Sequence, residues 1–430
     1  MPSTTAAHGS HQRPNVLRDA SWSAVIAGFV AVVVSYAGPL LVVLEAARAA
    51  GLSAQLTASW VWAISVGSGL CCLVLSWATR QPVMVAWSIP GAALLIAVLP
   101  GYVAQNRLGE VIGAYLVVGV LSALLGVTGL FGRLIAAIPR PITAAVLAGV
   151  LFPFAIKVAN AVIAAPLVAG GLLLGYLLGR RFLPRYAVFV AMAIGAVLAV
   201  ASGSTQALEV RFALTTPVWI TPAFSLDAVL GLGIPLLIVT AAGQNAPGLI
   251  VMHTSGYEAN DRLLLGSCGV ASAIFAPFAC HALNLAAVTA AIATSRESHP
   301  DHDRRYVAGM SCGVFYIIGG FLATFIVSLF SAIPAGMITA LAGVALLAPL
   351  QNSLFDSMHE GPHHRSVIEA ALITLAVTLS GIQPFGVVSA FWGLLAGVAA
   401  YALLRPHDHR RRTQRTGAAG PEGTGGRPVR

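Results

Sequence analysis

Three groups of polar residues stand inside long apolar stretches of this sequence, where polar side chains are costly and usually functional. The first is the stretch 244–248 (Gln-Asn-Ala-Pro-Gly), which breaks a helix and offers two amides for hydrogen bonding. The others are His281 with Asn284, and Ser88 before Pro90. Imidazole exchanges a proton near neutral pH, so His281 is a candidate proton carrier. The alternatives are amides that join helices and a histidine that only caps a helix start.

Two short apolar segments, 83–98 and 281–295, hold the Ser88 and His281 groups. Each follows a stretch rich in residues that favour strands, so each predicts an extended piece and then a half-helix. Pro90 suits the first turn of a helix, and Ser88 and Asn284 are candidate N-caps. Two half-helix N-termini would make a spot lined by N–H groups, fit for a carboxylate. The alternative is that Pro90 only kinks a continuous helix.

Aromatic and acidic residues refine the kind of ligand. Trp87, Tyr36 and Phe278 are candidates for an aromatic pocket, although a single aromatic side chain more often only packs. None of the fifteen acidic residues falls at the middle of the spans that carry the polar groups; Glu45 lies late in the first span. A site without fixed negative charge suits an anion better than a cation, and Glu45 is a second candidate for the proton.

A histidine cluster raises a different chemistry. His359, His363 and His364 have the H-x3-H-H spacing of membrane di-iron enzymes. We expect these residues in a loop between spans, without the helical frame that a metal centre needs. Solvated loop histidines are therefore the main interpretation, a membrane metalloenzyme is a remote alternative, and no metal or other cofactor is predicted.

The elements that hold these residues must lie in a membrane. Of the 430 residues, 57% are hydrophobic and only 9% are charged, against about 25% charged residues in a soluble domain. This composition excludes a soluble enzyme, a secreted disulfide-rich module, a nucleic-acid binder and a disordered regulator. The five cysteines all fall in apolar segments, where they are expected to pack as small buried side chains.

Apolar stretches long enough to span a bilayer recur along the whole chain. They predict fourteen helices, near 22–48, 56–78, 83–98, 109–131, 139–157, 160–179, 184–202, 227–251, 262–278, 281–295, 305–331, 334–350, 366–382 and 384–404. With both termini in the cytoplasm, 20 of the 24 Lys and Arg residues fall on the cytoplasmic side, as the positive-inside rule requires. The polar ends, 1–20 and 405–430, are expected to be disordered.

The two halves of the chain resemble each other. Ile138-Pro139 recurs 195 residues later as Ile333-Pro334, and 90–94 (Pro-Gly-Ala-Ala-Leu) resembles 284–288 (Asn-Leu-Ala-Ala-Val) at an offset of 194. Seven spans per half would give the halves opposite orientations, as in many secondary transporters. The predicted fold class is therefore an all-α polytopic membrane protein, a 7+7 inverted repeat with half-helices at spans three and ten.

At these residues the sequence resembles the benzoate–proton symporter family, over about residues 20–404. The motifs that carry the resemblance are Thr57-Ala58-Ser59-Trp60-Val61-Trp62-Ala63, Ala86-Trp87-Ser88-Ile89-Pro90-Gly91-Ala92-Ala93-Leu94-Leu95, Gln244-Asn245-Ala246-Pro247-Gly248, His281-Ala282-Leu283-Asn284-Leu285-Ala286-Ala287-Val288-Thr289-Ala290-Ala291-Ile292 and Ala390-Phe391-Trp392-Gly393-Leu394. Within the pocket that the resemblance implies, Ile89 stands where threonine is usual and Gly243 where serine is usual.

The family lies in a wider group that resembles uracil and xanthine permeases. That resemblance implies a core domain (21–131 and 227–331) that moves like an elevator against a gate domain (132–203 and 332–404), with an external loop at 204–226. It also implies a homodimer through the gate domain. Uracil-type members use acidic residues in spans eight and ten, and Gln244, Asn245 and Asn284 occupy that neighbourhood here.

The resulting prediction is a bacterial-type inner-membrane transporter, not an enzyme, that imports a benzoate-like aromatic carboxylate with a proton. Ser88, Gln244 and Asn284 would donate to the carboxylate, Trp87 and Tyr36 would cover the ring, and Asn245, Ile89 and Pro90 would complete the pocket. His281 is the first candidate for the proton site and Glu45 the second. Rival interpretations are transport of a nucleobase or inorganic anion on the same fold and, more weakly, a channel.

Overall fold

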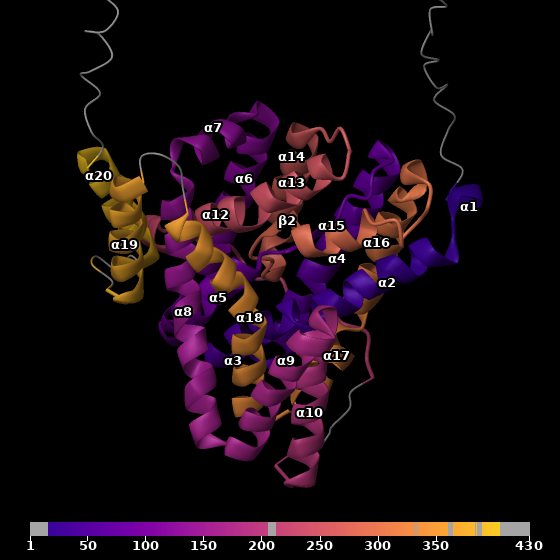
Figure 1. Cartoon of the computed structure of the whole chain (residues 1–430), viewed down its shortest axis with the longest axis horizontal. Helices are drawn as coiled ribbons and strands as arrows, with labels where there is room; N and C mark the ends of the chain where they lie inside the picture. The colour runs from indigo at the N-terminus through magenta and orange to yellow at the C-terminus, as the bar shows by residue number, and fades with distance from the viewer. Residues whose placement is uncertain are drawn as a thin grey trace, which may run out of the picture.

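A computed structural model describes residues 16–204, 212–331, 333–359, 364–382, 384 and 389–404. Most of the polar N-terminal end and all of 405–430 lie outside the described residues, so their predicted disorder stays a prediction. Nearly all described segments are helical, and the helices surround one short strand pair in the middle of the molecule (Figure 1).

Residues 16–204 form helices, two irregular helical turns and one strand. They are α1 (Val16–Asp19), α2 (Trp22–Ala37), α3 (Pro39–Ala49), α4 (Ala54–Thr79), β1 (Val85–Trp87), α5 (Ile89–Ala104), α6 (Leu108–Thr128), α7 (Leu130–Ala137), α8 (Arg140–Ala164), η1 (Pro166–Gly170), α9 (Gly171–Phe182), η2 (Pro184–Tyr186) and α10 (Ala187–Ala201).

The described residues from 212 onward repeat this mixture. They form α11 (Leu226–Ala228), η3 (Val229–Gly233), α12 (Ile234–Thr240), η4 (Ala241–Asn245), α13 (Ala246–Thr254), α14 (Asp261–Phe275), η5 (Ala276–Phe278), β2 (Leu283–Leu285), α15 (Ala287–Ala293), η6 (His302–Arg304), α16 (Tyr306–Phe321), α17 (Ala323–Ser331), α18 (Ala335–Met358), α19 (His364–Leu379) and α20 (Ser389–Leu404).

Among the described residues, seven helical segments are long and apolar enough to cross a membrane. The number is eight if the bent pair of α16 and α17 counts as one span, and α5, α10, α19 and α20 add four shorter apolar helices. The all-helical polytopic class is confirmed by these segments. The number of fourteen spans remains a prediction, because the short spans do not meet the length of a full crossing.

Two spans that the sequence presents as continuous contain an interruption: in the first a single residue leaves the helix but Trp22–Ala49 still counts as one span, and the second bends sharply. The predicted span 22–48 divides at Gly38, directly before Pro39 opens α3. The predicted span 305–331 divides at Leu322, where α17 leaves the axis of α16 by 69°. Thr215 occupies the second break, since its backbone N–H donates to Phe321 O and its hydroxyl accepts from the N–H of Thr324.

The gate-region repeat found in the sequence corresponds to matching elements. Pro139 and Pro334 precede α8 and α18 with nearly the same backbone angles, φ −54° and ψ 133° against 137°. Each helix carries an interior proline about four turns on, Pro153 and Pro349, and the two helices pack together. The conformation of both helix starts follows from the fixed φ of proline.

The second sequence match is wrong by one helical turn. It sets Asn284 opposite Pro90, whereas α5 begins at Ile89 directly after β1 and α15 begins at Ala287 directly after β2. The structurally equivalent positions are therefore 198 residues apart, not 194. The predicted cap role of Asn284 is wrong for the same reason: Asn284 lies within β2, and Ala286 is the N-cap of α15.

Small residues bring the central helices close together. A Cβ atom on Gly69 of α4 would lie 2.7 Å from the carbonyl of Gly313 in α16, and one on Gly313 would lie 2.6 Å from Gly69 O. In α16 a Cβ on Gly319 would meet the Tyr36 hydroxyl at 2.6 Å. Such close backbone approach is the usual way for helices to pack in lipid, where burial of apolar surface gives no drive.

The buried apolar residues form two clusters. The larger one runs mainly through α2–α6 and α12–α16, surrounds the strand pair and also takes in residues of α8, α17, α18 and α20. The smaller one joins α8, η1, α9, α10 and α18, with Leu41 of α3 as its contribution from the first span. We call the helices of the larger cluster, apart from α8, α18 and α20, the larger body; α8 and α18 contribute to both clusters and join them.

The described part of the loop predicted to be external, 212–225, is an extended strap. Its backbone N–H groups at Val218, Ile220 and Ala223 donate in turn to Ser59 Oγ (2.8 Å), Pro277 O (2.8 Å) and Gly109 O (2.8 Å). These partners lie in α4, η5 and α6, so the strap joins several helices of the larger body at one end of the molecule.

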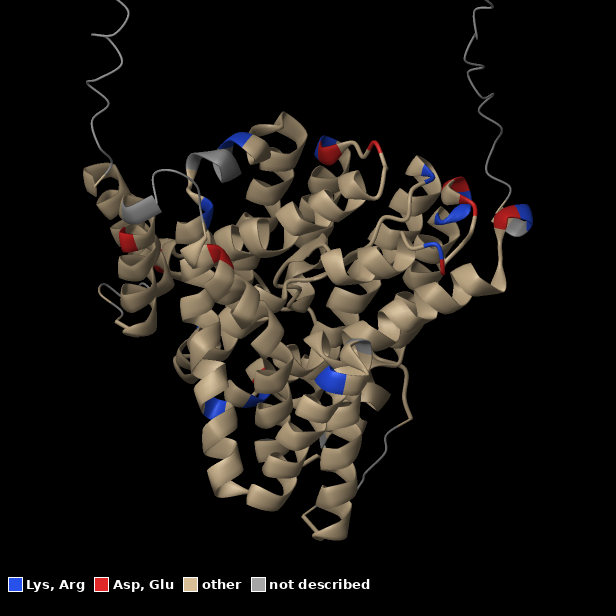
Figure 2. Cartoon of the chain, in the orientation of Figure 1, with Lys and Arg blue, Asp and Glu red and all other residues tan. Residues whose placement is uncertain are grey.

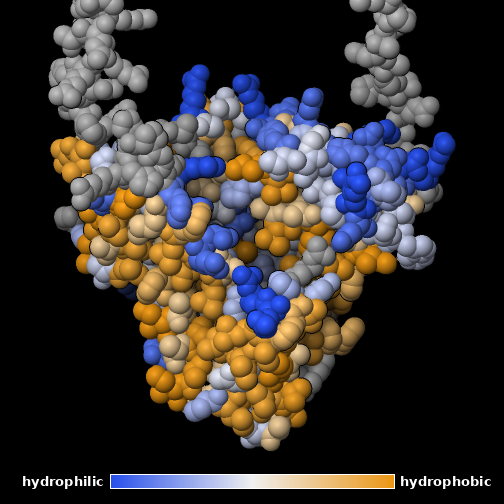
Figure 3. Space-filling view, viewed as in Figure 1, coloured by the Kyte–Doolittle hydropathy of each residue, from blue (hydrophilic) through white to orange (hydrophobic). Residues whose placement is uncertain are grey.

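Charge and apolar surface separate along the molecule. Lys, Arg, Asp and Glu of the described residues gather mainly in the loops at the upper end of Figure 2, with few lower down. Apolar side chains cover most of the surface below that end (Figure 3). This distribution fits a protein whose body lies in lipid and whose upper loops contact water.

Candidate functional site

The centre of the candidate site is the antiparallel pair of β1 and β2. Ala86 faces Asn284 in the register, and the bonds from Ser88 N to Ala282 O (3.1 Å) and from Ala286 N to Met84 O (2.9 Å) extend the ladder at both ends. All six strand residues are buried. Extended backbone at this depth is stable only where protein groups take its N–H and C=O groups.

Neighbouring side chains take most of the outward-facing backbone groups. Ser76 Oγ bonds to both N–H and C=O of Val83 at 3.1 Å, and Cys72 Sγ bonds to both groups of Val85 at 3.1 and 3.3 Å. On the other strand, Ser272 Oγ accepts from the N–H of Leu283 at 2.8 Å. The predicted site residue Asn245 also binds an outward-facing backbone group of β2, since its Oδ1 accepts from Leu285 N at 3.0 Å.

Ser88 starts the half-helix α5, as predicted from the sequence. Its hydroxyl caps the helix by accepting from Gly91 N at 3.0 Å and lies 2.7 Å from the hydroxyl of Thr240 in α12. Pro90 lies in the first helical turn, where its missing N–H costs nothing, and Ile89 is half-buried beside it. Thr240 was not predicted, because a single threonine in an apolar run is common.

His281 is fully buried and both of its ring nitrogens have partners. The indole N–H of Trp60 donates to Nδ1 at 3.1 Å, and Nε2 lies 2.9 Å from the carbonyl of Ser88. An indole nitrogen only donates and a carbonyl only accepts, so His281 is the neutral Nε2–H tautomer. A second proton on Nδ1 would have to displace Trp60, which links protonation of His281 to the strand pair and the start of α5.

The side-chain amides of Asn284 and Gln244 differ in which hydrogen-bonding groups remain without a partner among the described residues. Asn284 is fully buried, and its Nδ2 donates to Leu285 O at 2.9 Å, so its unpartnered group is the acceptor Oδ1 rather than the predicted donor. Gln244 lies in the π-helical turn η4, is half-buried and makes no side-chain hydrogen bond within the described part of the chain. Gln244 therefore keeps both its donor and its acceptor for a ligand.

Three aromatic rings meet beside β1. The ring of Trp87 lies 5.9 Å from that of Tyr36 and 5.7 Å from that of Tyr316, both edge to face, and its buried Nε1 has no partner in the part of the chain that the structure describes. The hydroxyl of Tyr36 donates to Ser65 (2.6 Å). The predicted pair Trp87 and Tyr36 is thus together, and Tyr316 is an addition that its apolar surroundings in the sequence concealed.

Phe278, the third aromatic residue considered from the sequence, belongs to another cluster. Its ring lies 5.4 Å from that of Trp62 and 5.5 Å from that of Trp219 in the strap. Phe278 therefore packs between α4 and the strap, and the structure does not place it with Trp87.

Glu45, the second proton candidate, is paired at the contact of α3 with α18. Its side chain is 2% exposed and receives both Nε and Nη2 of Arg48 at 2.8 Å. Thr339 of α18 donates to the same carboxylate at 3.0 Å. The side chain of Arg48, which is 42% exposed, thus compensates the buried carboxylate of Glu45.

Replacing Arg48 with methionine is expected to destabilise the protein more than replacing Arg48 and Glu45 together, with methionine and glutamine. Removal of one partner leaves a buried charge unpaired, which costs about 3 kcal/mol or somewhat less for a half-exposed arginine. Thermal unfolding of the purified variants in detergent measures the difference. Equal unfolding temperatures for the single and double variants would contradict a buried, charged Glu45.

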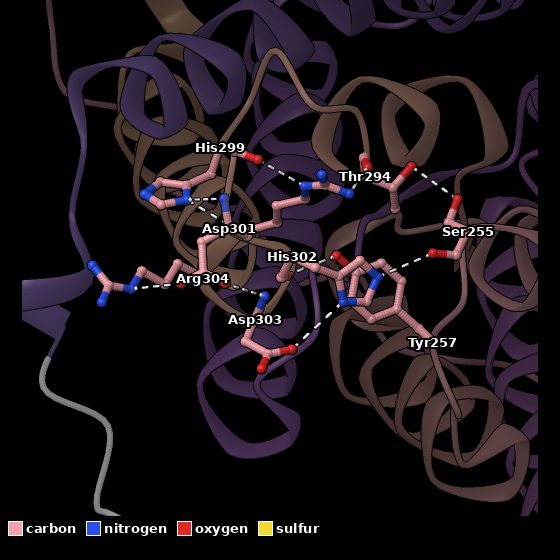
Figure 4. Close-up of polar contacts among 9 residues, drawn as sticks. Ser255, Tyr257, Thr294, His299, Asp301, His302, Asp303 and Arg304 are labelled. Carbon is pink, nitrogen blue, oxygen red and sulfur yellow. Dashed lines mark hydrogen bonds and ion pairs between the residues drawn. The ribbon is translucent and has the colours of Figure 1, made fainter.

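The histidines in the loops have local partners. In Figure 4, His299 accepts from the backbone N–H of Asp301 at 3.0 Å, and His302 bonds to Ser255 O at 3.1 Å while stacking on Tyr257 with 4.1 Å between ring centres. Burial raises the pKa of Tyr257 to about 12, so its neutral hydroxyl donates to His302 O. These contacts connect the end of α13 to the loop before α16.

The described part of the proposed histidine cluster does not resemble a metal centre. The ring of His359 stacks on that of Phe355 with 3.8 Å between ring centres, and His359 Nδ1 bonds to the backbone carbonyl of Phe355. His363 lies outside the described residues. Among the residues that the structure describes, no three His, Cys, Asp or Glu side chains are grouped to hold a metal ion.

Solved structures with low sequence identity share this fold. The chain aligns with the transmembrane domain of a cyanobacterium bicarbonate transporter, BicA, at a TM-score of 0.56 and 15% identity, covering 87% of this chain and 97% of that one. With the structure of SLC26A9 the TM-score is 0.62 at 13% identity, covering 91% and 67%. At this identity the likeness concerns the fold alone.

Sequence relatives are closer. The chain is 38% identical to the inner membrane protein YdcO of Escherichia coli (strain K12), over 88% of this chain and 95% of that protein. It is 37% identical to the benzoate membrane transport protein of Acinetobacter baylyi (strain ATCC 33305 / BD413 / ADP1), over 90% and 96%. The benzoate membrane transport protein family, BenE, matches residues 18–403, which include every element of the site. The chain therefore belongs to this family of membrane transporters and is not an enzyme.

Proposed function

We propose that this protein imports benzoate or a closely similar aromatic carboxylate together with a proton. The observation that carries the proposal is the group around Trp87: a buried, unpartnered N–H donor beside two further aromatic rings, at the start of a half-helix. An aromatic acid has both parts that this group would recognise, a flat ring and an anionic end.

The surroundings support an anion. In the first turn of α5, Gly91 N–H is capped by Ser88 and Pro90 has no N–H, so the N–H of Ile89 is the one for which the described residues give no acceptor. A helix start also favours negative charge. Gln244 adds an amide without a partner in the described residues. Glu45 is neutralised by Arg48, so the described residues around the strands leave no unpaired acidic group facing the site.

The proton assignment stays with His281 first and Glu45 second. His281 contacts the carbonyl of Ser88, the residue that caps α5, so protonation there would be felt at the helix start that receives the substrate. Protonation of Glu45 would instead alter the contact between α3 and α18, where Thr339 donates to its carboxylate. The two candidates therefore differ in which contact a proton would alter.

We further propose an elevator mechanism on a 7+7 inverted repeat. The larger body around the strands would be the core domain and the body of α8–α10 and α18–α20 the gate domain. The antiparallel strands, each followed by a half-helix, and the matched prolines of α8 and α18 support the repeat. The protein would lie in the inner membrane with both termini in the cytoplasm, and a homodimer would form through the gate domain.

The test is uptake of labelled benzoate into proteoliposomes with an imposed inward proton gradient. We expect saturable, protein-dependent uptake that collapses when a protonophore is added. Protein-free liposomes are the necessary control, because protonated benzoic acid crosses lipid unaided. No uptake above that control would reject benzoate as substrate. If benzoate is taken up but unlabelled uracil or bicarbonate competes more strongly than unlabelled benzoate, the preferred substrate is a nucleobase or an inorganic anion.

A further inference from the structure

One position on the outward edges of β1 and β2 lacks the partners that the other positions have. In this pair the even-numbered residues bond across the ladder, as the bonds of Ser88 to Ala282 and of Ala286 to Met84 establish. Bonding alternates along antiparallel strands, so the odd-numbered residues direct their N–H and C=O groups away from the partner strand. Trp87 is one of these residues.

The equivalent outward groups are occupied elsewhere. Cys72 bonds to Val85 in β1, and Ser272 bonds to the equivalent Leu283 in β2. Leu285, the equivalent of Trp87, gives its N–H to Asn245 Oδ1. Trp87 receives no such bond from the described residues, so the two strands differ at this one position.

The helix α4 runs along the outward edge of β1 with a regular spacing. Ser76 accepts from the N–H of Val83, and Cys72 accepts from the N–H of Val85. A step of four residues toward the start of α4 therefore corresponds to a step of two residues toward the end of β1. The rises agree, at about 6 Å for four helical residues and about 6.6 Å for two strand residues. The next pair in the series is Ser68 with Trp87.

Ser68 and Trp87 both have unpartnered polar atoms in full burial. Ser68 is 0% exposed and Trp87 1%, and neither Ser68 Oγ nor Trp87 Nε1 has a hydrogen-bond partner among the described residues. The serine nearest Ser68 on the same helix face, Ser65, accepts from the Tyr36 hydroxyl. Orphaned buried polar atoms are rare in native proteins, so each of these two requires an explanation.

We propose that the substrate carboxylate binds at this open edge, where it accepts hydrogen bonds from the backbone N–H and the indole N–H of Trp87 and from the hydroxyl of Ser68. One carboxylate oxygen would take at Trp87 the place that Asn245 Oδ1 takes at Leu285. The inference rests on the proposed function and adds Ser68, which no motif in the sequence singles out, as a substrate-binding residue.

The neighbouring rings complete the argument for an aromatic acid. Tyr36 and Tyr316 stand edge to face against Trp87, and their hydroxyls are already used by Ser65 and Ser35. They therefore present ring carbon rather than polar groups to a ligand. A carboxylate at Trp87 would thus have donors on one side and aromatic surface on the other.

The test is equilibrium binding of labelled benzoate to purified Ser68→Ala, Ser68→Thr and Trp87→Phe proteins. Ser68→Ala and Trp87→Phe should each weaken binding about tenfold or more, the usual effect of removing a hydrogen bond to a charged group. Ser68→Thr, which keeps the hydroxyl, should bind within a few-fold of wild type. Benzamide, without the negative charge, should lose less affinity than benzoate in both weakened variants.

Thr378→Val is the matched control. Thr378 of α19 also has a buried hydroxyl without a partner, outside the site, so its removal deletes the same chemical group and should leave benzoate binding unchanged. Unfolding temperatures separate weak binding from poor folding, and Trp87→Phe tests the edge independently if Ser68→Ala is unstable.

The outcomes separate the two claims. If wild type fails to bind benzoate, the proposed function is rejected and this inference with it. If wild type binds benzoate and both Ser68→Ala and Trp87→Phe bind equally well, the function stands and the carboxylate lies elsewhere.

Discussion

Replacing His281 with glutamine is expected to lower proton-driven uptake by about tenfold or more while the protein stays folded, because the amide cannot take up a proton between pH 5 and 8. Glutamine can still donate to the carbonyl of Ser88 and accept from Trp60, the two bonds that the imidazole makes. The variant thus keeps the contacts and removes the titration. Initial rates of labelled benzoate uptake, with and without a proton gradient, measure the effect.

Counterflow provides the control for His281. With labelled benzoate outside, unlabelled benzoate inside and no gradient, exchange of a loaded carrier does not require net proton movement, so His281→Gln should retain most of it. Trp60→Phe leaves Nδ1 of His281 without its donor, and should move the pH at which uptake is half-maximal upward, since a free Nδ1 takes a proton more readily. Wild-type gradient-driven uptake in His281→Gln would transfer the proton role to Glu45.

The second large effect is expected from Asn245→Leu. The change keeps the size of the side chain but leaves the buried N–H of Leu285 without an acceptor, which should cost about 1–3 kcal/mol of stability. Because β2 leads directly into α15, we also expect uptake to fall well below wild type. Thermal unfolding in detergent and initial uptake rates are the two measurements.

The neighbouring residue is the matched control for Asn245. Gln244 has an amide too, but makes no hydrogen bond within the described residues. Gln244→Leu should therefore leave the unfolding temperature nearly unchanged and reduce benzoate affinity instead. If both variants lost stability equally, the bond from Leu285 to Asn245 would not be what holds β2.

Much of the architecture could be predicted because lipid imposes it. Composition alone required a membrane protein, and Ser88 with Pro90 correctly marked the start of a half-helix after an extended stretch. Asn284 could not be placed from its own neighbourhood. Its position in β2 depends on pairing with Ala86, almost two hundred residues earlier in the chain.

Breaks inside uniformly apolar spans were also beyond sequence reasoning. Thr215 stabilises the bend between α16 and α17. Its hydroxyl accepts from the N–H of Thr324, and its own N–H donates to the carbonyl of Phe321. Nothing near Leu322 in the sequence signals that a distant loop residue replaces the helical bonds there. Tyr316 escaped for a similar reason, since it is an ordinary tyrosine until Trp87 of β1 lies beside it.

The hydrogen bonds of Cys72 bear on how this protein can be labelled. All five cysteines are free and buried, so thiol reagents should leave the native chain largely unmodified and engineered surface cysteines should react selectively. A cysteine-free variant for spin or fluorescence labelling should nevertheless not be made by replacing all five cysteines with alanine. Cys72→Ala would strip both bonds from Val85, whereas Cys72→Ser offers a hydroxyl to the same backbone groups, as Ser76 does one turn away.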